Sequence, residues 1–250
     1  EKESVYGGTT AKSGGVAWIP ANHRQAEVHV KDTTEEGYAY LKALIGDSVS
    51  DARIRAYAER AKEMLQFMMQ HSHVQYSALP KYMDYYEHLK GYKVGGRSMD
   101  NTPINLRRLG SDAASIRLGH YDGIMPFNVT VEEGQRLQEM DAGAYLLGMR
   151  LLLRFLLDIP ARFKHKRDDR LTLGPALVAR LRLSLQDRDI PLWLDSPIQE
   201  LLLDKGRVCG ALVQRAGTTT RVSARHGVLL ATGGFSHNAE MRRQYQQAPI

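Results

Sequence analysis

Residues 7–15 constrain the fold of this chain more than any other segment, because they consist mostly of glycine, threonine and serine. Glycine reaches positive φ without steric cost and lets backbone N–H groups approach a ligand closely. Thr9, Thr10 and Ser13 add short hydroxyl donors to this open backbone. The segment therefore predicts a cradle for an anionic group, and a flexible surface loop is the alternative that the same composition allows.

A second glycine pair lies near the other end of the chain. Residues 227–231 form a fully apolar run that favours a strand inside a parallel sheet. The segment Ala231-Thr232-Gly233-Gly234-Phe235 completes this run. A strand that ends in a glycine turn suits a ligand site, and an ordinary exit from strand to loop is the alternative.

Glu1 has the charge and position of a ribose-binding residue. In dinucleotide-binding units, an acidic residue about 20 positions after a Gly-x-Gly-x-x-Gly turn bonds the ribose hydroxyls. No such turn occurs in the 250 residues, and the chain does not start with methionine. We therefore expect an internal fragment that lacks the first strand, the glycine turn and the first helix. A complete domain starting at Glu1 is the alternative, and it would leave residues 7–15 without a preceding strand.

The composition limits the class of protein. With 250 residues and 43% hydrophobic content, the chain can form one large domain or two small ones. Its net charge of +6 comes from 34 basic residues interleaved with 28 acidic ones, which suits an anionic cofactor better than nucleic acid. Cys209 is the single cysteine, which excludes an internal disulfide and indicates a reducing compartment. We expect a cytoplasmic protein, and attachment at the membrane periphery stays open.

Two helices are predicted before residue 71. The first begins at Asp32 or Thr33 and stops at Gly46, and the second begins at Ser50. Apolar residues at i, i+3, i+4 spacing predict one buried stripe on the second helix. This stripe consists of Ile54, Tyr57, Ala58, Ala61, Met64, Leu65 and Met68.

The apolar helix predicted for residues 132–157, with a break near Gly143, is not expected to cross a membrane. Arg150, Arg154 and Asp158 recur every four residues and place three charges on one face. The remaining faces are apolar, so we expect an amphipathic helix that packs inward.

Three further segments are interpreted from composition and spacing. Residues 71–127 lack periodicity and are rich in tyrosine, glycine, proline and arginine, which favours a functional or lid-like loop. Residues 164–170 are charged and predict a solvated connection. A helix is predicted from Thr172, and its arginines lie away from an aligned row of Leu177, Leu181 and Leu185.

The last third of the chain is rich in strand patterns. A short strand is predicted at 190–194, a hairpin joins 201–203 to 208–213 through a turn at Gly206, and a further strand follows at 221–224. Together with the apolar run described above, this order predicts an α/β fold with an inserted antiparallel ribbon.

Four segments resemble the FAD-binding domain of the fumarate reductase and 3-ketosteroid dehydrogenase flavoprotein superfamily, and they occur in the family's order. They are Gly7-Gly8-Thr9-Thr10-Ala11-x-Ser13-Gly14-Gly15-x-x-Trp18-Ile19-Pro20-x-Asn22, Gly174-x-Ala176-Leu177, Gly206-Arg207-Val208-x-Gly210 and Ala231-Thr232-Gly233-Gly234-Phe235-x-x-Asn238. The resemblance implies a Rossmann-like domain of glutathione-reductase-like topology that lacks its first βα unit. It implies an FAD-binding domain over 1–235 and the start of a substrate-capping catalytic domain over 236–250.

The resemblance also implies how FAD would be held. Glu1 would bind the ribose, Ile198 would meet the adenine through its main chain, and Thr232–Gly234 would close over the adenosine and pyrophosphate. The residues that would line the remaining pyrophosphate and flavin are Gly7, Gly8, Thr9, Thr10, Ala11, Ser13, Gly14 and Gly15, and Ala231 would accompany the second glycine pair.

The segments 32–41, 82–86 and 95–98 look more like the ketosteroid dehydrogenases than like the fumarate reductases. The resemblance implies an aromatic pocket for a flat apolar ketone such as a 3-ketosteroid, with Tyr85 as the catalytic tyrosine. The family's usual proline is Met83 here, so Tyr82 and Tyr86 stay open as alternatives to Tyr85, and so does a plain surface cluster of tyrosines.

The implied reaction removes an α proton from a ketone and passes the β hydride to flavin N5, after which an external electron acceptor reoxidises the cofactor. A fumarate-reductase-like enzyme is the first alternative, and Arg97, Arg107 and Arg108 would supply its cationic pocket. A non-catalytic FAD-binding paralogue is the second. No metal site is expected, because His71-x-His73 has no third ligand nearby.

Overall fold

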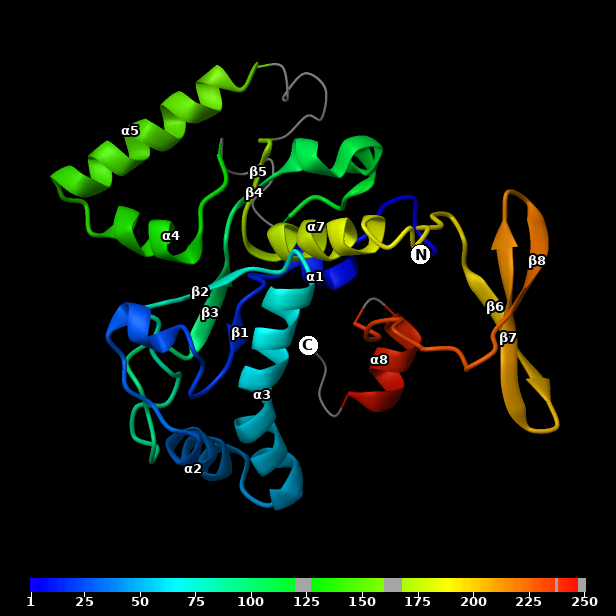
Figure 1. Cartoon of the computed structure of the whole chain (residues 1–250), viewed down its shortest axis with the longest axis horizontal. Coiled ribbons are helices and arrows are strands. Elements are labelled where there is room, and N and C mark those ends of the chain that lie inside the picture. The colour runs from blue at the N-terminus through cyan, green and yellow to red at the C-terminus, as the bar shows by residue number, and fades with distance from the viewer. Residues whose placement is uncertain (120–126, 160–167, 237, 247–250) are drawn as a thin grey trace. The chain divides into compact units, whose positions relative to one another are not determined.

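The computed structural model describes residues 1–119, 127–159, 168–236 and 238–246. Its contacts divide into two compact units, and each is considered by itself below. The smaller unit consists of Glu1–Thr9 and Leu192–Ile250, and the larger one is Thr10–Pro191. Figure 1 follows the elements along the chain from blue to red.

The centre of the larger unit is a small antiparallel sheet with the order β1-β3-β2. Its strands are β1 (Ala17–Trp18), β2 (Tyr76–Ala78) and β3 (Ser98–Asn101). All residues of β3 are buried, and β1 and β2 pair with its two edges. The core that packs on this sheet consists of Ile19, Ala61, Leu65, Val74, Tyr76, Ala78 and Met99.

Helix α2 (Thr34–Ile45) begins and ends where the sequence predicts. The Thr33 side chain accepts a hydrogen bond from Glu36 N, and the Glu36 carboxylate accepts one from Thr33 N, which forms a capping box. Gly46 ends the helix with φ of 62°. A short 3-10 helix, η1 (Gln25–Val28), precedes α2.

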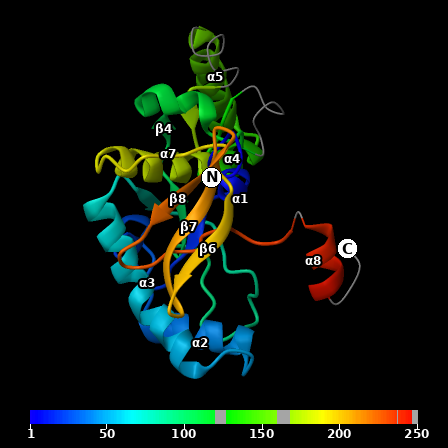
Figure 2. The same cartoon turned by 90° about the vertical axis from the view of Figure 1, so that its right-hand side faces the viewer.

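Helix α3 (Asp51–His71) follows Ser50 as predicted, and Figure 2 shows it beside α2. Four members of the predicted stripe are buried, but Tyr57 and Met64 are about half exposed, so the predicted stripe was too wide. The hydroxyl of Tyr57 donates to Trp18 O over 2.6 Å. This residue therefore lies at the edge of the core rather than within it.

The segment 71–127, predicted as a functional or lid-like loop, contains regular elements in its described part. Besides β2 and β3, it forms β4 (Ile104–Asn105) and the 3-10 element η2 (Leu106–Ser115). The strands are only two to four residues long, too short to show the alternation by which longer strands are recognised. Residues 120–126 lie outside the described residues.

The predicted helix over 132–157 consists of α4 (Val131–Gln138) and α5 (Ala142–Leu157), with a break slightly before the predicted position. Thr130 caps α4 through Glu133 N, and Asp141 caps α5 through Ala144 N. No helix among the described residues is long and apolar enough to cross a membrane, as expected.

The charged run predicted as solvated is partly buried. Asp168 and Asp169 are almost fully buried, and Arg154 lies within 4 Å of both carboxylates. Arg107 adds a second cation to Asp169. Desolvated carboxylates are tolerated where cations compensate them, and a pattern of charged letters does not reveal such partners. Residues 164–167 lie outside the described residues.

Helix α7 (Leu173–Gln186) begins after Thr172 as predicted and follows β5 (Arg170–Leu171), which pairs with β4. Its buried face is not the predicted leucine row, since Leu181 and Leu185 are more than a third exposed. Arg180 is buried instead and donates to the carbonyls of His73, Thr102 and Pro103. Backbone acceptors therefore compensate a buried cation that the pattern assigned to the surface.

The smaller unit contains the predicted antiparallel ribbon. Its strands are β6 (Ile198–Asp204), β7 (Arg207–Arg215) and β8 (Thr218–Ser223), and a short helix, α8 (Ala239–Tyr245), follows. Lys205 and Gly206, both with positive φ, form the turn between β6 and β7. The ribbon prediction is confirmed, with β8 starting three residues before the predicted strand.

Two strand predictions are wrong. Neither 190–194 nor 227–231 forms a strand, and Leu229 is 91% exposed. An apolar central strand needs neighbours on both sides, and the strands described in this unit pair only within the ribbon. The fold is mixed α/β with antiparallel pairing throughout the described strands, and the glutathione-reductase-like topology stays a prediction.

Candidate functional site

The glycine-rich segment forms a short helix rather than a loop. Helix α1 (Gly8–Lys12) lies between Gly7, with φ of 116°, and Gly15, with φ of 64°. The Ser13 hydroxyl donates to Thr10 O over 2.8 Å and accepts from Gly15 N over 3.0 Å. These bonds fix the chain between the end of the helix and the second glycine pair.

The segment has an exposed side and a buried side. Gly8, Thr9, Thr10 and Gly14 are exposed, which leaves their backbone and hydroxyl groups accessible. Ala11 is fully buried, so its side chain faces the protein and not a ligand. The predicted binding residues therefore divide into those that can face a cofactor and one that supports them.

Gly15 packs tightly against α7. A Cβ atom on Gly15 would lie 2.7 Å from Gly174 N, and one on Gly174 would lie 2.0 Å from Thr10 O. Gly174 N donates to Ser13 O over 3.1 Å. The glycines of this segment thus serve close packing between backbones as well as access for a ligand.

Asn101 is a residue of this site that the sequence patterns did not reveal. Its Nδ2 donates to Gly15 O over 2.7 Å, and the Tyr76 hydroxyl donates to the same oxygen over 3.3 Å. Asn101 Oδ1 is buried, and none of the described residues provides a hydrogen bond to it. A buried acceptor without a partner beside the glycine segment indicates a donor from outside the described chain.

The remaining predicted cofactor residues lie in the smaller unit. Glu1 O accepts from Ser196 N over 2.9 Å, so the start of the chain runs beside the residues that lead into β6 and Ile198. Ala231, Thr232, Gly233 and Gly234 form an exposed segment without helix or strand. A Cβ atom on either glycine would meet nothing within 4 Å, so this backbone is open.

These features fit FAD. In the larger unit, the exposed Thr10 and the unpartnered Asn101 Oδ1 suit a ligand held by backbone and short polar groups. In the smaller unit, taken by itself, the exposed Thr9 and the open backbone at Gly8, Gly233 and Gly234 have the same character. The acidic Glu1 adds the charge that a ribose diol takes as a hydrogen-bond acceptor.

An aromatic cavity of about 370 Å³ lies in the larger unit, which is within the range of small-molecule sites. Val16, the residue after Gly15, is part of its wall, so the cavity begins where the glycine segment ends. Its lining is formed by Val16, Trp18, Tyr40, Leu41, Leu44, Tyr57, Tyr82, Met83, Asp84, Tyr85 and Ser98. A cavity with this lining takes a flat apolar molecule and offers it a few hydroxyl groups.

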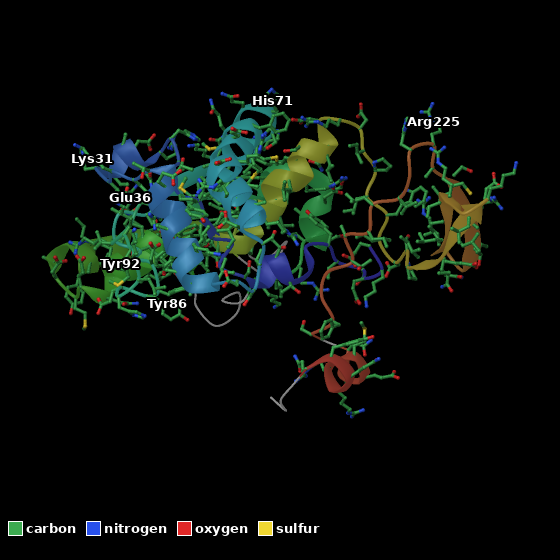
Figure 3. All side chains as sticks on the ribbon, turned by 90° about the horizontal axis from the view of Figure 1, so that it is seen from below. Lys31, Glu36, His71, Tyr86, Tyr92 and Arg225 are labelled. Atoms are coloured by element: carbon green, nitrogen blue, oxygen red, sulfur yellow. The ribbon has the colours of Figure 1, made fainter. Side chains whose placement is uncertain are left out.

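Of the three candidate tyrosines, Tyr82 and Tyr85 line this cavity and Tyr86 does not. The Tyr85 side chain is 82% exposed and free to meet a ligand. A hydrogen bond to Tyr85, together with burial, raises the pKa of Tyr82. The backbone N–H of Tyr86 donates to the Tyr40 hydroxyl over 3.1 Å, which ties this segment to α2. Figure 3 shows Tyr86 and Tyr92 beside the helix that carries Glu36.

A buried ion network lies under the cavity. Arg97 pairs with Asp32 over 2.6 Å and with Asp84 over 2.7 Å, and all three side chains are excluded from solvent. Burial alone would raise the pKa of Asp32, but hydrogen bonds from Arg97 and Ala21 outweigh it and lower the pKa of this carboxyl.

The cationic pocket considered for a dicarboxylate is not supported. Arg97 is committed to Asp32 and Asp84, and Arg107 is paired with Asp158 and Asp169. Arg97 is excluded from solvent and is therefore not available to a substrate carboxylate. Arg107 is 56% exposed, and Arg108, the third arginine considered, is also exposed, but neither lines the aromatic cavity.

Three buried carboxylates, those of Asp158, Asp168 and Asp169, lie within 4.8 Å of one another. Arg107 and Arg154 neutralise them, and burial raises the pKa of Asp158. Their geometry is accounted for by ion pairs within the fold. His73, considered at the outset, bonds Asp187 over 2.6 Å.

Comparison with known proteins identifies the family of this chain. The FAD binding domain family matches residues 1–250. The chain is 38% identical to a 3-oxosteroid 1-dehydrogenase of Comamonas testosteroni over its whole length, and 31% identical over 98% of its length to a 4-oxocyclohex-2-ene-1-carboxylate 5-dehydrogenase of Sinomonas cyclohexanicum. It covers 44% and 41% of these two proteins.

A solved structure is also similar to this chain. The 3-ketosteroid Δ1-dehydrogenase of Sterolibacterium denitrificans, in complex with 1,4-androstadiene-3,17-dione, matches 98% of this chain with a TM-score of 0.89 and 37% identity. The chain spans 44% of that protein, so it corresponds to less than half of the relatives it matches. From its family match, its residues and these relatives, the chain belongs to the FAD binding domain family and is similar to 3-ketosteroid Δ1-dehydrogenases.

Proposed function

We propose that the protein containing this chain is an FAD-dependent 3-ketosteroid Δ1-dehydrogenase, or a close relative that desaturates a flat cyclic ketone. The observation that carries the proposal is the aromatic cavity that begins at Val16, directly after the glycine segment, and includes Tyr85. A flat ketone in this cavity would lie next to the segment proposed to hold the flavin.

Each proposed cofactor contact uses a residue with an accessible group. The backbone and hydroxyls of Gly7–Thr10 and Ser13–Gly15 would hold the pyrophosphate and flavin, and Glu1 would bind the ribose. The main chain of Ile198 and the segment 231–234 would cover the adenosine side. Bound FAD supplies the hydride acceptor that the chain itself lacks.

The chain's own contribution to the reaction is binding and proton transfer. The carbonyl of the ketone acidifies the neighbouring α C–H, and Tyr85 would accept this proton as the general base. The stacked rings of Trp18 and Tyr57 would orient the flat substrate. Groups that stabilise the developing enolate would come from the part of the protein beyond this chain.

The family resemblance also suggests how the whole protein is divided into domains. We place the FAD-binding domain at 1–235 and the start of a substrate-capping domain at 236–250. The single Cys209 supports a cytoplasmic location, and an external electron acceptor would complete the cycle.

The test uses the full-length protein. Visible absorption should show bound flavin, and a 3-ketosteroid added without oxygen should bleach it. In parallel samples, 4-oxocyclohexanecarboxylate replaces the steroid, and fumarate is added to dye-reduced protein. Bleaching by the smaller ketone alone would narrow the substrate class to cyclohexanone acids. Reoxidation by fumarate without bleaching by either ketone, or a colourless protein, would contradict the proposal.

A further inference from the structure

We propose that Arg97 is a positioning residue for Tyr85, acting through the carboxylate of Asp84. This inference rests on the proposed function, because it concerns the tyrosine assigned there to proton transfer. It assigns a catalytic consequence to a buried arginine that does not line the cavity.

Asp84 is fixed by three donors, and Tyr85 follows it directly in the chain. Arg97 Nη1 donates to Asp84 Oδ2 over 2.7 Å, and Lys93 N donates to the same oxygen over 3.0 Å. Trp18 Nε1 donates to Asp84 Oδ1 over 2.6 Å. Both oxygens of this carboxylate are therefore held, so its backbone has little freedom.

The backbone on the two sides of Tyr85 is also bonded. Asp84 N donates to Lys93 O over 3.0 Å, and Tyr86 N donates to the Tyr40 hydroxyl over 3.1 Å. The exposed Tyr85 ring thus projects from a segment whose neighbours are both fixed. Of these anchors, the Arg97–Asp84 pair carries full charges and is excluded from solvent, so it is the strongest.

Arg97 connects this anchor to the rest of the cavity. Its Nε and Nη2 donate to the two oxygens of Asp32 over 2.8 and 2.6 Å, which places one guanidinium between two carboxylates. The same group lies 5.3 Å from the Trp18 ring and 5.7 Å from the Tyr40 ring. One planar cation therefore sets the distance between the tyrosine segment and two aromatic walls.

Lysine cannot replace this geometry. An ammonium group is a point charge and cannot bond two oxygens of Asp32 and one of Asp84 in a single plane. Arg97→Lys keeps the charge and most of the side-chain volume, so it should loosen the Asp84 anchor, while Asp32 and Asp84 each keep two other hydrogen-bond donors. A displacement of about 1 Å at a catalytic group can lower a rate about 100-fold.

The experiment compares Arg97→Lys with Arg180→Lys in the full-length flavoprotein. Arg180 is also buried, but it bonds backbone carbonyls away from the cavity, so its variant controls for loss of stability alone. Hydrogen exchange of residues 82–93 and steady-state turnover of a 3-ketosteroid are measured on both, at equal flavin content.

For Arg97→Lys, we expect faster exchange at the amides of Asp84, Tyr86 and Lys93, a fall in kcat of about 10- to 100-fold and a KM within about threefold of the wild type. The pH profile of kcat should shift, because the tyrosine would sit in an altered environment. Arg180→Lys should change neither the exchange of this segment nor the pH profile.

Unchanged exchange in Arg97→Lys would overturn the inference whatever the activity. Faster exchange with wild-type kcat would show that Arg97 holds the segment without affecting catalysis, and would overturn it as well. A wild type that binds flavin but converts no ketone would instead contradict the proposed function, and the catalytic role of Arg97 would fall with it.

Discussion

Gly174 is a residue whose role follows from its neighbours rather than from its own conformation. It has no positive φ, yet a Cβ there would lie 2.0 Å from Thr10 O and 2.6 Å from Ser13 O. The start of α7 therefore supports the glycine segment only if residue 174 has no side chain. Asn101 supports the same segment from β3 through Gly15 O.

We expect Gly174→Ala to lower the free energy of unfolding by about 1–3 kcal/mol and to weaken flavin binding, because the segment must move away from α7. Thermal melts and flavin titration of the full-length protein measure both effects. Gly134→Ala is the matched control, since a Cβ at that helical position meets nothing within 4 Å. It should be neutral or stabilising by up to about 1 kcal/mol, and an equally harmless Gly174→Ala would contradict the packing argument.

Asp100 gives a second prediction for a single residue. Burial raises its pKa from 3.8 to about 6, Glu133 and Glu132 add to the shift, and hydrogen bonds from Val131 N and Asn101 N oppose it. The folded state therefore holds this proton more tightly than the unfolded state, so stability from this group is present at low pH and is lost as pH rises from about 4 to about 6.

Asp100→Asn removes this dependence. Relative to the variant, the wild type should lose up to about 3 kcal/mol of unfolding free energy between pH 4 and pH 7. Denaturant unfolding of both proteins at several pH values measures the difference. Asp204→Asn, at the exposed end of β6, controls for the loss of one carboxylate. A constant difference between the wild type and Asp100→Asn over this range would contradict the argument.

At the scale of elements, the helix starts differ in how they are capped. Thr33 and Ser50 both precede helices and looked equivalent in the sequence. Thr33 forms a capping box with Glu36, whereas the Ser50 side chain makes no capping hydrogen bond. A comparison of the two positions therefore shows how much the capping hydrogen bond itself contributes to stability.

Thr33→Ala should destabilise the larger unit by about 1 kcal/mol, because Glu36 N loses its acceptor. Ser50→Ala should cost clearly less, since no bond is removed. Chemical denaturation of the two variants compares these values directly. Equal losses would mean that the capping bond at Thr33 contributes little.

The elements that were predictable are those with local signals. Helices α2, α3 and α7 start at the predicted residues, and the ribbon turns at Gly206, because caps and turns are encoded within a few positions. β3 and β4 were missed, since strands of two to four residues are too short to show a period. The run 227–231 was misassigned because a strand depends on partners that its own residues do not specify.

The candidate site also combines residues that have local sequence signals with residues that meet only after folding. The glycine segment was proposed from its composition and Tyr85 from a family resemblance, and both roles stay predictions, although Val16, Trp18 and Tyr85 line one cavity. Tyr40, Tyr57 and Asn101 were not identifiable as site residues, because they come from α2, α3 and β3 and meet only after folding. Arg97 was considered for the cationic pocket of the fumarate-reductase-like alternative, and its two buried carboxylate partners argue against that role.

At the scale of the whole molecule, each unit contains some of the residues proposed to bind the cofactor. The boundary between the units falls within α1, after Thr9, and the residues proposed for the ribose and the adenosine belong to the smaller unit. The aromatic cavity belongs to the larger unit alone. Binding of FAD and binding of the ketone should therefore respond to different sets of substitutions.

The most direct measurement is the rate of flavin reduction by a 3-ketosteroid in a single anaerobic turnover of the full-length protein. Wild type, Tyr85→Phe and Tyr86→Phe are compared, because Tyr86 is adjacent but does not line the cavity. We expect rapid bleaching in the wild type and, at equal flavin content, a rate of bleaching at least about 100-fold lower in Tyr85→Phe. The rate in Tyr86→Phe should stay within about threefold of the wild-type rate. Equal rates in the wild type and Tyr85→Phe would contradict the assignment of Tyr85, and no bleaching in the wild type would contradict the proposed reaction.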